Sequence, residues 1–127
     1  NLIILYQNLY FYKNKKINTM LTNYWIWLAI ASSILTNIGF KLAAMVTNHP
    51  TKKWMTFAVA LIFGLINSVC MTEALKTIPL NIASALFFSL TIIGLLFSAH
   101  FIFHDAITWK QMVGTCVIIV GVILINL

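Results

Sequence analysis

The chain has 127 residues, of which 61% are hydrophobic and only 8% are charged, and its formal net charge is +6. A soluble domain carries about 25% charged residues, so this composition excludes an ordinary water-soluble globule. The lysines lie singly or in pairs beside apolar runs, which argues against a nucleic-acid-binding surface and favours the flanks of membrane spans.

Residues 1–19 form an aromatic, Asn-rich and Lys-rich lead before Met20. Its apolar part comes first and its lysines follow, whereas a secretory signal peptide carries its positive charge before the apolar stretch. We expect the lead to be either a loose interfacial anchor or translated upstream sequence. The second interpretation places the natural start at Met20. The lysines concerned are Lys13, Lys15 and Lys16.

Four apolar runs follow, each close to the roughly 20 residues that cross about 30 Å of hydrocarbon. Irregular backbone cannot face lipid, so each run is expected to be helical, and short turns make neighbouring helices antiparallel. The sequence therefore predicts an all-α, four-helix transmembrane bundle with both termini on one side of the membrane. The membrane domain is 20–127, with spans at about 24–45, 54–75, 80–103 and 109–127.

The positive charge of the loops orients this bundle only weakly. Lys52, Lys53 and Lys110 lie on one side and Lys76 on the other, and the three lysines of the lead bring the two sides nearly level. Both orientations can then coexist in one membrane. Four helices enclose little space, so we expect a solute path to require two chains.

One face of the first span is polar. Ser33, Asn37 and Lys41 follow each other at intervals of four residues and share this face, with Ser32 and Thr36 beside it. An Asn is costly in hydrocarbon unless it is hydrogen-bonded, so the face is expected to meet either a partner helix or a solute path. Lys41 is interpreted as an anchor whose long stem reaches the interface.

The third and fourth spans contain aromatic and small residues, and each group can serve either packing or the binding of a solute or a second chain. Phe87 and Phe88 can stack on a flat or cationic solute or simply fill space. Gly114 and Gly121 leave a groove for a helix of a second chain or of the same chain. The small residues of the third span let backbones approach or line a path; they are Ser84, Ser89, Thr91, Gly94 and Ser98. The candidate path residues are Ser33, Asn37, Ser84, Phe87 and Ser89.

The remaining polar chemistry indicates neither an enzyme nor a cofactor. Cys70 and Cys116 lie within apolar runs, where free thiols behave as small hydrophobes, and no His/Cys spacing fits a zinc site. His100, with His104 and Asp105 one turn beyond, is either an interfacial group or part of a proton relay. No acid, base, nucleophile and metal ligand converge, so we expect no catalysis and no bound metal.

Three stretches together resemble the small multidrug resistance family, which is part of the drug/metabolite transporter superfamily. They are Asn37–Lys41 (NIGFK), Glu73–Pro79 (EALKTIP) with Ile82 and Ala83, and Gly114 with Gly121–Leu127. The resemblance implies a four-helix exporter that works as an antiparallel homodimer, or as a heterodimer with a paralogous subunit, in membrane lipid. It also implies a location in the bacterial inner membrane.

The chain departs from that family at its coupling residue. Drug exporters of the family carry a glutamate midway along the first helix, and alignment through Lys41 places Ser33 there. The family's tyrosine and tryptophan early in the third helix fall on Ser84 and Phe87. Serine cannot exchange a proton for a cation, so we expect transport of a neutral, zwitterionic or lipid-like solute without glutamate-based coupling. The alternatives are a flippase subunit for lipid-linked aminoarabinose and a non-coupling partner subunit.

Overall fold

The computed structural model describes residues 1–46 and 48–126, and the side chains of 1–15, 23–46 and 48–125. These residues form five helices and, within the described ranges, no strand, which confirms the all-α class. The helices are α1 (Leu2–Thr22), α2 (Tyr24–Met45), α3 (Pro50–Ala74), α4 (Leu80–Phe101) and α5 (Trp109–Asn126). The lead before Met20, for which no secondary structure was predicted, lies in the helix α1.

Local chemistry explains where the central helices begin. The Asn23 side chain caps α2, because its Oδ1 accepts a hydrogen bond of 3.1 Å from the Trp25 backbone N–H. Pro50 begins α3, at a position where a missing N–H costs nothing. This proline makes α3 start four residues before the span expected at 54. Pro79 precedes α4 and ends the turn that follows α3.

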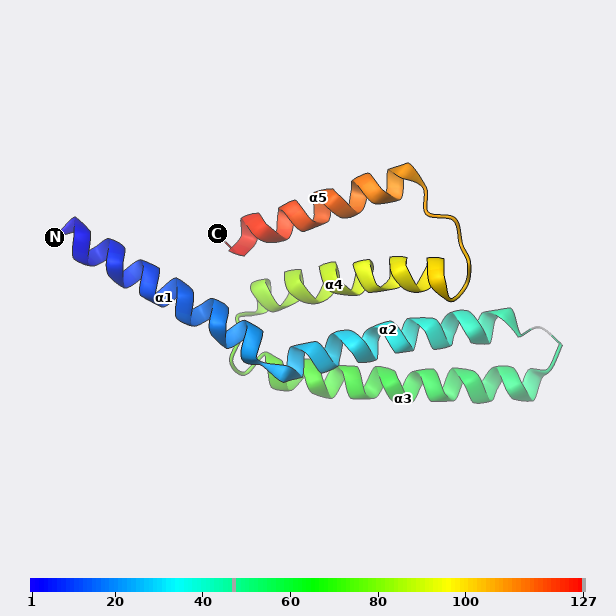
Figure 1. Ribbon diagram of the computed structural model, residues 1–127. Coiled ribbons are helices and arrows are strands. Elements are labelled where there is room, and N and C mark those ends of the chain that lie inside the picture. Colours follow the sequence, from blue (N-terminus) through cyan, green and yellow to red (C-terminus); the bar gives the residue numbers. More distant parts are fainter. Residues whose placement is uncertain (47, 127) are drawn as a thin grey trace.

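The helices are arranged in a row. Packing joins α3 to α2, α2 to α4, and α4 to α5, and Figure 1 shows α2 between α3 and α4 with α5 on the far side of α4. The first helix, α1, extends away from this row. The expected closed bundle of four helices is therefore not confirmed. Among the described helices, α3 packs closely only against α2, and α5 only against α4 (Figure 1).

Three of the described helices, α2, α3 and α4, are long and apolar enough to cross a membrane. The apolar part of α5 is shorter and runs over Trp109–Ile125. At a rise of about 1.5 Å per residue it spans about 25 Å, less than the hydrocarbon thickness of about 30 Å. The fourth span thus stays a prediction, and Leu127, its expected last residue, lies outside the described residues.

The buried core lies where α2 and α4 meet the end of α3. It is small and apolar, while large hydrophobic side chains elsewhere are exposed, as is expected of a protein whose outer surface meets lipid. Its members are Ile26, Ala29, Ile30, Cys70, Ala74, Ile78, Ile82, Ala83 and Phe87. Cys70 is thus a buried free thiol, whereas Cys116 is an exposed one.

Candidate functional site

The polar face of α2 holds three of the five buried polar residues found in the described part of the chain. Ser32, Ser33 and Thr36 are all buried, whereas Asn37 and Lys41 are exposed. Thr36 Oγ1 donates to the Ser32 carbonyl at 2.8 Å, and Asn37 Nδ2 donates to the Ser33 carbonyl at 2.9 Å. These two side chains are therefore satisfied within α2 itself, and neither bond joins two helices.

The helices α2 and α3 approach each other closely, and glycine residues make this approach possible. A Cβ atom added to Gly39 would lie 2.7 Å from the Cβ atom of Ala60, so only glycine fits there. One added to Gly64 would lie 3.6 Å from Thr36 Cγ2, an ordinary contact distance. The two contacts show that α2 and α3 run antiparallel (Figure 1).

Contacts of α2 with α3 and α4 place one polar residue from each of the three helices at the same height along the helix axes, which we call the same level. Starting from the Thr36–Gly64 contact, three residues back along α2 and three forward along antiparallel α3 place Ser33 level with Asn67. On the other side of α2, Gly94 of α4 lies against Ile34. Figure 1 shows that α2 and α4 run in the same direction. Counting back from the Ile34–Gly94 contact, Thr91 then lies within about 3 Å of Ser33 along the helix axes.

Of the candidate path residues on α4, only Phe87 belongs to the buried core. Its ring packs edge-on against Phe88 with 5.3 Å between centroids. Ser89 is buried and donates to the Leu86 carbonyl at 3.0 Å, while Ser84 is partly buried. Two residues along a helix correspond to about 200° of rotation, so Phe87 and Ser89 lie on nearly opposite faces of α4. The five candidates therefore do not form one surface within a single chain.

The sequence analysis did not single out Asn67, and it treated Thr91 as one of the small residues of the third span that either let backbones approach or line a path. The side-chain oxygens Asn67 Oδ1 and Thr91 Oγ1 are buried, and neither has a hydrogen-bond partner among the described residues. An amide in the middle of an apolar run was the available signal for Asn67. Only the packing of the helices shows that both oxygens are buried.

The ionisable groups lie away from this level. Glu73 forms a salt bridge of 2.8 Å with Lys76 near the end of α3. His100 Nδ1 lies 3.2 Å from the Asp105 carbonyl oxygen, in the loop after α4. Lys41 Nζ lies 5.8 Å from the centre of the Phe103 ring, which places its charge at the end of α2. Among the described residues, no group of three or more His, Cys, Asp or Glu side chains could hold a metal ion.

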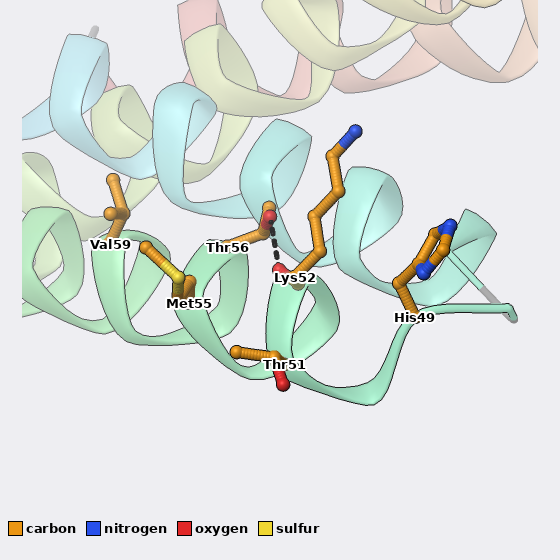
Figure 2. A pocket seen from close by; sticks show the side chains of 6 residues that line it. All are labelled: His49, Thr51, Lys52, Met55, Thr56 and Val59. Carbon is orange, nitrogen blue, oxygen red and sulfur yellow. Dashed lines mark hydrogen bonds between the residues drawn. The ribbon is translucent and has the colours of Figure 1, made fainter.

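A hollow of about 610 Å³ opens at the first turns of α3 (Figure 2). Thr56 Oγ1 donates to the Lys52 carbonyl at its wall, at 2.9 Å. The hollow lies at the end of the row and its lining residues are mostly exposed, so it is a surface depression and no part of a path through the row. Its lining residues are His49, Thr51, Lys52, Met55, Thr56 and Val59.

Comparison with known proteins gives the family. The sequence profile of the EamA-like transporter family matches residues 4–127, which is nearly the whole chain. This family belongs to the drug/metabolite transporter superfamily, so the broader part of the expected resemblance is confirmed. No curated protein and no solved structure matches the chain. With its apolar helices, the chain is an integral membrane protein that belongs to the EamA-like transporter family.

Proposed function

We propose that this protein is a transporter similar to the small multidrug resistance exporters, and that it moves an uncharged, zwitterionic or lipid-like solute without glutamate-based proton coupling. The observation that carries the proposal is the buried face of α2, where Ser32, Ser33 and Thr36 are enclosed between α3 and α4. This face provides hydroxyl groups and no carboxylate. It suits a solute that is recognised by hydrogen bonds.

Electrostatics disfavours a cationic solute. A charge at mid-membrane costs about 2.5–3.5 kcal/mol even on the lowest scales, so a binding site for a cation needs an acid at the same depth. The two acids of the chain are Glu73 and Asp105. Glu73 is paired with Lys76 near the end of α3, and Asp105 lies in the loop before α5. Neither shares the level of Ser33.

The open row supports the proposal that two chains complete the transporter. A Cβ atom added to Gly114 or Gly121 would meet nothing within 4 Å among the described residues. An apolar depression of about 400 Å³ runs along α5 and is lined by Trp109, Met112, Val113, Cys116, Val117 and Val120. A second copy of the chain, antiparallel to the first, would cover this face and bring the scattered path residues of two chains together.

A non-coupling subunit is the second candidate function. The resemblance to the small multidrug resistance family aligns the buried Ser33 with the acid of the drug exporters, and the glycines of α5 have nothing within 4 Å of an added Cβ atom among the described residues. A paralogous subunit that carries a glutamate at the corresponding position would then supply the coupling. Co-expression with such a paralogue distinguishes the two functions, because only the subunit requires it. We place either form in the bacterial inner membrane.

Two measurements test the absence of a coupling acid. Cells that express the chain are expected to gain no proton-dependent resistance to ethidium, and robust resistance would contradict our reading of Ser33. In detergent, the Ser33→Glu variant is expected to release a proton when tetraphenylphosphonium binds, because a carboxylate at this position can be exchanged between proton and cation. The Ser33→Gln variant is the control of equal size. No proton release from Ser33→Glu would contradict the family-like path along α2.

A further inference from the structure

Asn67 Oδ1 needs a hydrogen-bond donor from outside its own helix. Asn67 lies in the middle of α3, where every backbone N–H is already bonded to the carbonyl four residues earlier. The oxygen is nevertheless buried and has no partner among the residues that the structure describes. A buried acceptor without a partner costs about 1–3 kcal/mol in water-soluble proteins, so an unfilled site is unfavourable.

Thr91 differs from several other hydroxyl residues of these helices in how its side chain is bonded. Thr36, Ser68 and Ser98 each donate to the carbonyl four residues earlier, as a hydroxyl in an apolar helix usually does. Thr91 Oγ1 is without such a bond within the described part of the chain, although its residue is only 6% exposed. Its hydroxyl is therefore free to donate to, or accept from, a bound group.

The two oxygens lie at one depth in the row. The Thr36–Gly64 and Ile34–Gly94 contacts put Asn67 level with Ser33 and Thr91 within about 3 Å of that level. Ser33 is the tenth of the 22 residues of α2, so this level lies close to the middle of the helix. Asn67 and Thr91 thus lie at the depth of the buried hydroxyl face of α2, one on each of the two helices that pack against α2.

We propose that Asn67 and Thr91, together with Ser33, form a hydrated hydrogen-bonding subsite at the middle of the membrane. Its occupants present O–H or N–H groups: water when no solute is bound, and the hydroxyl or amide groups of an uncharged solute during transport. The water-binding part is independent of the proposed function, whereas the solute-binding part rests on it. The competing explanation is a dry site in which Thr91 turns about χ1 to bond to the Phe87 carbonyl.

Thiol labelling in proteoliposomes distinguishes the hydrated site from the dry one. The chain carries Cys70→Ala and Cys116→Ser, and a single cysteine is introduced as Thr91→Cys or, for the control, Ile92→Cys. Ile92 is the next residue of the same helix and is 41% exposed, so it is the matched position at nearly the same depth on the outer surface. A membrane-permeant methanethiosulfonate reacts with thiolates, which require water. We expect Thr91→Cys to react at least tenfold faster, and equally slow reactions would overturn the proposal.

A second variant covers the case in which Thr91→Cys does not fold. Thr91→Val keeps the shape and removes the hydroxyl group. If the site is dry and the hydroxyl unpaired, this change raises the thermal unfolding midpoint by several degrees relative to the natural chain. If water fills the site, or if the hydroxyl is bonded to the Phe87 carbonyl, the midpoint stays unchanged or falls, and the labelling rates distinguish these two cases. A clear rise would therefore overturn the proposal independently of the labelling.

Protection against labelling tests the class of solute. Glycerol, erythritol and acetamide are the uncharged probes, and tetramethylammonium is the cation of similar size. We expect at least one uncharged probe to slow the labelling of Thr91→Cys twofold or more, and the cation to have no effect. Fast labelling that no uncharged probe slows would overturn the solute-binding part and leave the water site standing. Protection by the cation alone would contradict both that part and the proposed function.

Discussion

Asn23 Nδ2 donates a hydrogen bond of 2.6 Å to Thr77 Oγ1 and so joins the start of α2 to the turn between α3 and α4. The same asparagine caps α2 through its Oδ1 atom. One side chain therefore satisfies a free helix N–H and connects two parts of the chain that are 54 residues apart. This junction lies at the end of the row where the core residues Ile26 and Ile78 are buried.

The double role of Asn23 predicts unequal effects of two substitutions. Asn23→Ala removes the cap and the hydrogen bond to Thr77. Each contributes about 1 kcal/mol, so we expect the free energy of unfolding to fall by about 2 kcal/mol. Thr77→Val keeps the cap but removes the bond to Asn23 and the longer bond of 3.4 Å from Thr77 Oγ1 to the Ala74 carbonyl, and it is expected to cost about half as much. Titration of the folded protein with a denaturing detergent measures both. Equal losses would show that the cap contributes nothing.

The close approach of α2 and α3 predicts opposite effects of two glycine substitutions. Gly39→Ala introduces a methyl group 2.7 Å from Ala60 Cβ and is expected to lower stability by about 1–3 kcal/mol. Gly64→Ala meets only an ordinary contact with Thr36 and gains helix propensity, so its stability is expected to stay equal or to rise by up to about 1 kcal/mol. The detergent-denaturation midpoints of the two variants check this order. A stable Gly39→Ala variant would mean that the helices are farther apart than described.

The ion pair between Glu73 and Lys76 is exposed, so we expect it to contribute little to the free energy of unfolding. Their side chains are 34% and 65% exposed, and exposed pairs contribute about 0.2–1 kcal/mol. Glu73→Gln is therefore expected to change stability by less than about 1 kcal/mol and, in our proposal, to leave solute movement unchanged. Denaturation at low and high salt, with a proteoliposome assay, measures both quantities. A transport defect in this variant would assign Glu73 the coupling role that we deny it.

The open glycines of α5 predict a defect in association alone. Gly114→Val and Gly121→Val each fill the groove that we propose for a second chain, and we expect either variant to weaken dimer formation at least tenfold, or about 1.4 kcal/mol. Nothing described lies within 4 Å of either added Cβ atom, so the unfolding of the single chain is expected to change little. Energy transfer between labelled chains in liposomes measures the association. Unchanged association in both variants would remove α5 from the interface.

The sequence alone predicted the helices well where length and hydrophobicity decide. The expected first span 24–45 coincides with α2, because Asn23 supplies a cap at one end and polar residues follow the other. The span 80–103 agrees with α4 to within two residues, since Pro79 fixes its start. The transporter superfamily was also visible, because the motifs that carry the resemblance are local in the sequence.

The tertiary structure alone decided which polar residues are buried together. Periodicity placed Ser33 on the same face as Asn37, but it could not show that Ser33 is buried while Asn37 is exposed. Asn67 and Thr91 are separated by 24 positions, and their common level depends on where α3 and α4 cross α2. Helix periodicity is a property of one segment, whereas depth and burial depend on contacts between segments that are distant in the chain.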